Sequence, residues 1–168
     1  MASPFERSEV VFSTVRFFLM QSLAEELLLA NERFYEAFAA LDFKKMQCIW
    51  HSAPYVKCLH PGWHIISGFD EVMESWQLIF RNTFSMHFEL EEVEAVVLGR
   101  IGIVTLREHL LTANHPTEVP ARVALAATNI FELSDDGWKM ILHQAGPTDD
   151  GSHNHPDVDT EDESDLPR

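Results

Sequence analysis

The chain has 168 residues, of which 46% are hydrophobic and 11% aromatic, and its formal net charge is −15. This length and composition are those of one globular domain with a single buried core, and a second domain is not expected. The acidic balance and the absence of a basic stripe argue against nucleic acid or an anionic membrane surface as a partner.

The first 21 residues form an N-terminal extension to the predicted domain. Their apolar run, VVFSTVRFFLM at residues 10–20, is interrupted by Arg16 and is too short for a membrane helix, which needs about 20 apolar residues. Glu6 and Glu9 are unsuited to a secretory or transit signal. We expect an extra helix that packs on the domain or joins the next helix. A cytoplasmic location is expected, with organelle targeting as the open alternative.

Residues 22–41, SLAEELLLANERFYEAFAAL, predict a long amphipathic helix. Their apolar side chains recur every three or four positions, and the segment has no proline or glycine. Asp42 is a natural N-cap for a second, short helix, FKKMQCIW, which ends before Pro54.

The next segments predict a strand, a helix and a meander of strands. Residues 55–60 have the composition of a first strand, and a turn follows at Pro61-Gly62. Ser67 can cap a third helix whose apolar stripe includes Trp76. Beyond Asn82 the period of the apolar residues changes from 3.6 to 2. This period predicts four strands, at about 84–98, 101–112, 119–133 and 138–145.

Several predicted strands are apolar on both faces. Ile103 and Val104 point to opposite sides of one strand, as do Leu125 and Ala126 of the next. An antiparallel sheet with one face in water alternates apolar and polar residues more regularly. Because three helices can cover only one face, we expect a second copy of the chain on the other, which gives a homodimer packed sheet to sheet.

Residues 148–168 form an acidic tail. They hold eight acidic side chains against Arg168 alone and have few apolar residues, which predicts disorder. The tail also carries His153 and His155, but two histidines on such a segment make a weak metal site.

The common catalytic motifs are absent: there is no glycine-rich phosphate loop, CxxC pair, HExxH or GxSxG. His60 and His64 are four residues apart, but the Pro61-Gly62 turn between them removes the helical meaning of that spacing. Cys48 and Cys58 are read as ordinary buried thiols. We therefore expect no metal and no cofactor.

Aromatic residues gather on the elements that would border a hollow between a helix and a curved sheet. They are Tyr35, Trp50, Trp63, Trp76 and Phe80. Aromatic walls with a polar tip suit a flat, hydrophobic small molecule, which is the expected partner. Core packing is the alternative, above all for Trp76 and Phe80, which are at helical spacing.

Polar residues within apolar strands are the candidates for chemistry. Glu108 and Asn129 each interrupt an apolar run, and a buried carboxyl with a raised pKa can act as an acid or base near neutral pH. His60 and His143 titrate in that range without help. Arg107 and His109 replace Glu108 if the register places the opposite face inward.

Three segments, ANERFYEAFAALDFKKM, CLHPGWHIISGFDEVMESWQLIF and ATNIFELSDDGWKMILHQAGP, resemble the SnoaL-like and ketosteroid-isomerase-like domains of the nuclear-transport-factor-2-like superfamily. The resemblance covers residues 22–147. It implies an α+β, cystatin-like cone in which three helices pack on a curved antiparallel sheet, in the order α-α-β-α-β-β-β-β, and it implies a dimer.

The resemblance implies acid–base chemistry with altered residues. Ketosteroid isomerases carry their basic aspartate on the first strand, where this chain has Cys58-Leu59-His60-Pro61, and their oxyanion tyrosine falls on Phe34 here, beside Tyr35. His60 would then be the base, with Glu108 or Asn129 as donor, in an isomerase, cyclase or dehydratase. The alternative is a dimerisation or protein-association module without catalysis.

Overall fold

The computed structural model describes residues 4–148, with their side chains from residue 20 onward. In this range three helices pack against a six-stranded sheet. The helices are α1 (Pro4–Ala39), α2 (Phe43–Ile49) and α3 (Phe69–Asn82). The strands are β1 (Lys57–Leu59), β2 (Ile66–Ser67), β3 (Ser85–Leu98), β4 (Ile101–Ala113), β5 (Ala121–Ser134) and β6 (Gly137–Pro147). The acidic tail from residue 149 on, with its two histidines, lies outside the described residues.

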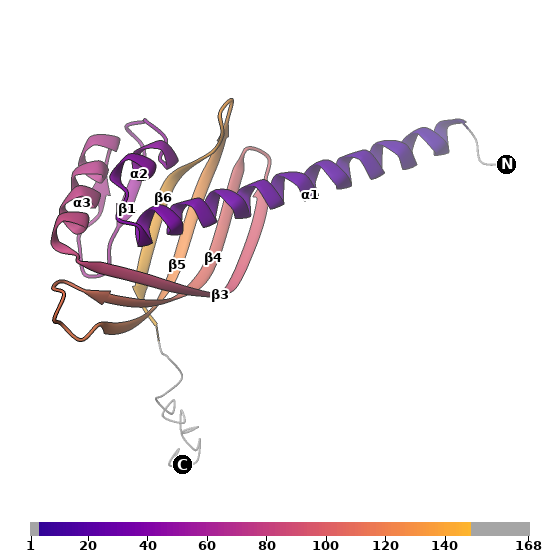
Figure 1. Ribbon diagram of the computed structural model, residues 1–168. Helices are drawn as coiled ribbons and strands as arrows, with labels where there is room; N and C mark the ends of the chain where they lie inside the picture. Colours follow the sequence, from indigo (N-terminus) through magenta and orange to yellow (C-terminus); the bar gives the residue numbers. More distant parts are fainter. Residues whose placement is uncertain (1–3, 149–168) are drawn as a thin grey trace, which may run out of the picture.

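The sheet has the order β2-β1-β6-β5-β4-β3, in which only the β1–β6 pair is parallel. Helix α1 crosses one face of strands β3–β6, while α2 and α3 lie beside β1 (Figure 1). A bulge between Glu91 and Glu94 bends β3, and Glu92 there adopts a positive φ of 51°. The α+β fold with three helices on a curved sheet is thereby confirmed.

Helix α1 has the apolar stripe that its sequence predicts. Leu27 and Phe34 are fully buried, because this side of the helix rests on the sheet. The extra helix expected in the first 21 residues is the beginning of α1 itself. The helix ends at Ala39, and Leu41 then turns the chain with a φ of 53°. Asp42 caps α2 as predicted, its Oδ1 accepting the Lys45 N–H at 3.0 Å.

Two expectations between residues 55 and 69 are wrong. Ser67 does not cap α3; it belongs to the two-residue strand β2, which the sequence pattern does not reveal. The N-cap of α3 is Gly68, at a φ of 95° that favours glycine, and it makes no side-chain cap bond. The first strand is also shorter than predicted, since β1 has only three residues.

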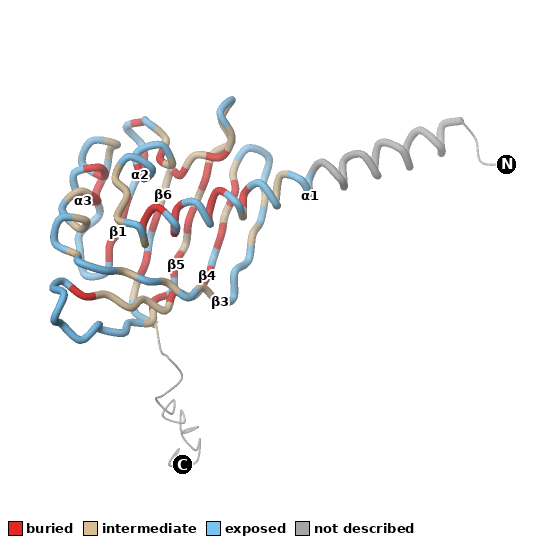
Figure 2. The backbone as a smooth tube through the Cα atoms, viewed as in Figure 1, coloured by how far each residue is buried: buried red, intermediate tan, exposed pale blue. Residues whose placement is uncertain are grey.

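Register places the polar candidates on the face that α1 covers. Val104 of β4 lies opposite Asn129 of β5, and Asn129 lies opposite His143 of β6. Directly opposed residues point to the same side of a sheet, and these three are buried. Figure 2 shows buried stretches on β4, β5 and β6, which are strands that α1 crosses. Strand alternation therefore brings Asn129 and His143 into the core together.

Candidate polar site inside the core

A buried hydrogen bond joins α1 to the sheet. The Tyr35 hydroxyl donates to Oε1 of Glu108 at 2.5 Å, and both side chains are buried. Tyr35 is on the same side of α1 as the apolar stripe, and Glu108 is on the inner face of β4. A carboxyl group in an apolar core needs such a partner, because an unpaired buried polar group is costly.

Asn129 connects this pair to two further side chains. Its Nδ2 donates to Oδ1 of Asn31 at 2.8 Å and to the Tyr35 hydroxyl at 3.3 Å. Its Oδ1 is 2.7 Å from Nδ1 of His143. Since that oxygen can only accept, His143 carries its proton on Nδ1 and has a lone pair on Nε2. The bonds run in one direction, from His143 through Asn129 and Tyr35 to Glu108, and they reinforce one another.

His60 belongs to a separate cluster. Its Nε2 is 3.0 Å from Oγ of Ser75, and the Ser75 hydroxyl donates to the Val72 carbonyl at 2.7 Å. Because the serine proton is bonded to the Val72 carbonyl, Oγ of Ser75 can only accept a hydrogen bond from His60. His60 therefore donates from Nε2 and has its lone pair on Nδ1. The rings of His60 and His143 are 6.4 Å apart, and Trp76 contacts both.

Burial shifts the pKa of each of these groups in the direction that favours the neutral form. It raises the pKa of Glu108 to about 7, although the bond from Tyr35 acts in the opposite direction. It lowers the pKa of His60 to about 4 and, together with the nearby His60, that of His143 to about 3. Burial and the neighbouring Glu108 raise the pKa of Tyr35. Near pH 7 the interior therefore holds two neutral histidines and a carboxyl group poised to exchange a proton.

Aromatic rings fill the hollow expected beside His60. Trp76 is fully buried and meets the His60 ring edge to face at 4.6 Å. Phe38 packs against the same indole at a centroid distance of 4.6 Å, and Trp63 lies 5.2 Å from His60 on the other side. Three of the best-defined cavities among the described residues are lined by other side chains, and none of these three is lined by His60, Glu108, Asn129 or His143.

Among the members of the network, Tyr35 lines one of these three cavities. It borders a hollow of about 300 Å³ between α1 and β3, together with Phe88 and Leu90.

The indole nitrogen of Trp76 is buried without a hydrogen-bond partner among the described residues. Such an N–H has an unmet demand for an acceptor, which costs about 1–3 kcal/mol.

The structure separates the other predicted ligand-binding residues from the network. Trp50 is buried beside Met140 at the edge of β6, and Trp63 is 41% exposed on the turn after β1. Arg107 and His109 point outward, where they pair with Glu92 and Glu91. The register thus selects Glu108 rather than these alternates.

Sequence reasoning missed two participants. Asn31 lies four residues before Tyr35, so both point from α1 into the same core. A polar residue on an otherwise apolar helical stripe is the signal that could have identified it. Ser75, one position before the buried Trp76, had no comparable signal.

Within residues 4–148 no three histidine, cysteine or acidic side chains come together in a way that could hold a metal ion. In the same range, no helix combines the length and hydropathy needed to cross a membrane.

Comparison with known families identifies the family of this chain. A family model of the SnoaL-like domain matches residues 28–149, which is most of the chain and includes every member of the polar network. The chain belongs to the SnoaL-like domain family. This SnoaL-like domain also has a related solved structure, a candidate dehydratase of the NTF2-like family from Streptomyces avermitilis. The two are 35% identical, with a TM-score of 0.71 over 76% of this chain and 97% of the other.

Two further relatives have different roles. A candidate calcium/calmodulin-dependent protein kinase type II association domain from Thiobacillus denitrificans is 28% identical to the SnoaL-like domain, with a TM-score of 0.62 over 71% of this chain and 93% of the other. The F-box protein SKIP8 of Arabidopsis thaliana is 27% identical over 119 residues, which are 71% of this chain. The match spans only 48% of the F-box protein.

Proposed function

We propose that the SnoaL-like domain is an association module that forms a homodimer through the outer face of its sheet. The observation that carries this proposal is a continuous apolar row across four strands. Val96, Ile103, Ile130 and Leu142 oppose one another in turn on β3, β4, β5 and β6. The next pair, Leu98 and Ile101, extends the row at one edge.

No helix among the described residues covers this row, since the helices lie on the other face. Val96 is 52% exposed and Leu98 61% exposed. An uncovered apolar patch of this kind, bordered by polar groups, is typical of a protein–protein interface. The polar border is present at the other end of the same face, where Arg107 and Arg122 form ion pairs and His109 forms a hydrogen bond with glutamates of β3.

The filled interior supports the same proposal, because Trp76 and its aromatic neighbours occupy the volume that a substrate would need beside His60. One relative is a candidate association domain by name, so this role has a parallel in the family. A second copy is the proposed occupant, since an apolar row can pack against itself across a two-fold axis.

The test measures the molar mass of the full chain by light scattering after gel filtration. The wild type is expected to elute as a dimer of 19.2 kDa subunits. Ile130→Asp and Val96→Asp place a charge in the row and are expected to give folded monomers. Val119→Asp is the matched control, because Val119 is 87% exposed outside the named strands and should leave the dimer intact. A monomeric wild type, or dimers of both row variants, would refute the proposal.

A second candidate function is acid–base chemistry on a hydrophobic small molecule. The specific observation is that Tyr35 borders the 300 Å³ hollow and also donates to Glu108, whose pKa of about 7 suits proton exchange. The Tyr35 hydroxyl has one proton, so a carbonyl group in that hollow could accept it only by displacing Glu108 as the acceptor. The name of the relative from Streptomyces avermitilis, a candidate dehydratase, agrees with such a role.

The chain contains a matched control for this second function. Tyr55 donates to Glu132 at 2.5 Å, as Tyr35 does to Glu108, but on the surface. If the second function is correct, an isoprenoid ketone such as β-ionone raises the melting temperature of the wild type and of Tyr55→Phe but not of Tyr35→Phe. Equal shifts in all three proteins, or no shift in any, would rule out a site at Tyr35.

A further inference from the structure

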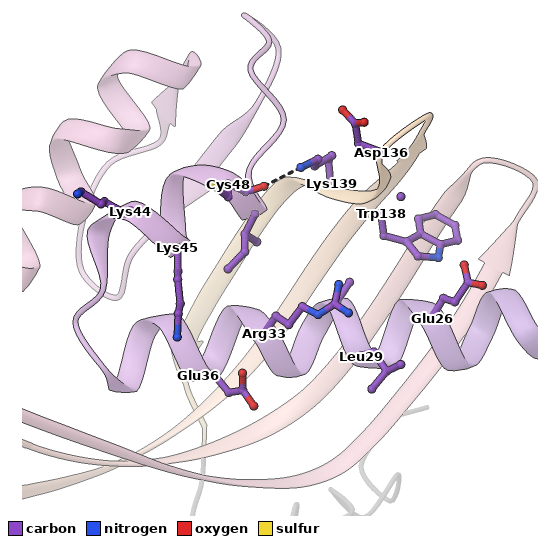
Figure 3. A pocket seen from close by; sticks show the side chains of 13 residues that line it. Glu26, Leu29, Arg33, Glu36, Lys44, Lys45, Cys48, Asp136, Trp138 and Lys139 are labelled. Carbon is purple, nitrogen blue, oxygen red and sulfur yellow. Dashed lines mark hydrogen bonds between the residues drawn. The ribbon is translucent and has the colours of Figure 1, made fainter.

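A groove of about 740 Å³ lies apart from the polar network. It lies between α1, α2 and the β5–β6 hairpin (Figure 3). The groove and the Tyr35 hollow share only Glu36 among their lining residues. The volume of the groove is within the range of about 300–1,000 Å³ that small-molecule sites have.

The groove carries a small excess of positive charge on an acidic protein. Four of the 12 lysine and arginine residues of the chain line it, although the net charge of the chain is −15. Figure 3 shows Arg33 rising from α1 and Lys45 reaching from α2 into the space between the two helices. Lys139 is held in place, because its Nζ donates to the Cys48 carbonyl at 2.8 Å.

These cations have few partners in the described chain. Lys45 approaches Asp42 at 4.0 Å, which is a weak contact, and Arg33 forms no ion pair there. Three acidic side chains, Glu26, Glu36 and Asp136, also border the groove. Even so, the cations outnumber the acids, which is the reverse of the balance over the whole chain.

An apolar wall completes the groove. The Trp138 ring is fixed, because its Nε1–H donates to the Leu23 carbonyl at 3.2 Å. Leu29 is 49% exposed and lines the groove from α1, and Ile49 contributes from α2. The indole is only 8% exposed, so the accessible leucine offers the larger surface for a flat or aliphatic group. The groove thus has an apolar wall and a guanidinium within one concave surface.

We infer that this groove binds a small organic acid with an apolar body. The carboxylate lies between Arg33 and Lys45, and the body rests on Trp138 and Leu29. Arginine is suited to this role, since its planar guanidinium can hold a carboxylate with two parallel hydrogen bonds. The inference does not depend on dimerisation or on the Tyr35 network, since none of the residues it uses lies in either.

Cys48 is exposed and lines the groove, so the expectation that it is a buried thiol is wrong, and its thiol provides a readout. Iodoacetamide should alkylate Cys48 and spare Cys58, which is buried and whose thiol pKa is raised by that burial. Bound 2-naphthoate is expected to slow the alkylation of Cys48 in the full-length chain. The uncharged 2-naphthamide, which has the same ring system, is expected to protect at least tenfold less well at equal concentration.

Arg33→Gln tests the assignment, with Arg81→Gln as its control. Both arginines are exposed on helices, but Arg81 lies on α3, outside the groove. A hydrogen bond to a charged group contributes about 1.5–3 kcal/mol, so Arg33→Gln should weaken 2-naphthoate at least tenfold and Arg81→Gln should not. Calorimetric titration gives the affinities, and circular dichroism verifies that each variant is folded. No protection by about 1 mM 2-naphthoate, equal protection by the amide, or unchanged affinity in Arg33→Gln would overturn the inference.

Discussion

Replacing Glu108 by glutamine tests whether the interior carboxyl is neutral in the folded protein. Burial raises its pKa from 4.5 to about 7. Between these values the folded chain keeps the proton, whereas the unfolded chain loses it. The folded state therefore binds more protons in this window, and the contribution of Glu108 to stability falls as the pH rises through it. Glutamine cannot ionise, and its side-chain oxygen can still accept from Tyr35.

The size of the effect follows from the difference in pKa. Each unit corresponds to about 1.4 kcal/mol, so the shift from 4.5 to about 7 corresponds to about 3 kcal/mol in total. About 2–3 kcal/mol of this falls between pH 5 and pH 8, because the unfolded carboxyl is already largely ionised at pH 5. The stability of Glu108→Gln relative to wild type should increase by that amount across the interval.

Urea unfolding at fixed protein concentration measures this difference at pH 5, 6, 7 and 8. Subtraction of the wild-type curve removes the contributions that the two proteins share, including those of the histidines. Glu132→Gln, at the exposed Tyr55–Glu132 pair, provides the baseline for losing a surface carboxylate. A constant difference between Glu108→Gln and wild type from pH 5 to pH 8 would show that Glu108 is ionised in the core, against the reasoning above.

Three further changes probe the core. Trp76→Ala should lower the free energy of unfolding by about 3–5 kcal/mol, because the indole is fully buried. Gly102→Ala should cost about 1–3 kcal/mol, since a Cβ there would lie 2.6 Å from Cδ1 of the fully buried Leu27. Acid should destabilise the wild type as the pH falls from 6.5 toward 4, because the unfolded chain protonates His60 and His143 while the folded chain, with pKa values of about 4 and 3, does not. These two histidines together outweigh the opposite contribution of Glu108 in this window.

Each of these changes has a measurement that can contradict it. Urea midpoints compare Gly102→Ala with Gly146→Ala, whose new Cβ would meet no atom within 4 Å; equal losses would mean that the close approach at Gly102 is unimportant. A Trp76→Ala loss below about 1 kcal/mol would show that the ring is not the centre of the packing. The acid prediction is checked with His60→Gln and His143→Gln, and it is wrong if neither variant reduces the pH dependence below pH 6.5.

Local patterns in the sequence predict much of this fold. The three- and four-residue spacing between Leu27 and Phe38 defines the buried side of α1. The two-residue period groups Glu108 with Val104 and Leu106 on one face of β4, because backbone geometry decides which side chains share a face. Both faces of β4 are largely apolar, so the sequence leaves Arg107 and His109 as alternates, and the structure shows that the face with Glu108 is buried.

Features that depend on non-local packing are harder to foresee. Strand β2 has only two residues and is defined by its pairing with β1, so no period could reveal it. The filled interior arises where Trp76 of α3 meets Phe38 of α1 and His60 after β1. Sequence spacing does not tell whether an indole fills such a space or borders it. The answer depends on how the side chains of α1, α3 and the turn after β1 pack against one another.

The most direct measurement of the central claim detects contacts between two copies of the chain. A sample mixed from ¹³C-methyl-labelled and unlabelled protein allows isotope-filtered nuclear Overhauser spectra to select such contacts. The account predicts intermolecular signals at the methyl groups of Ile103, Ile130 and Leu142, on the outer face of the sheet. A dimer whose intermolecular signals come from other residues, or a chain that gives none at millimolar concentration, would contradict it.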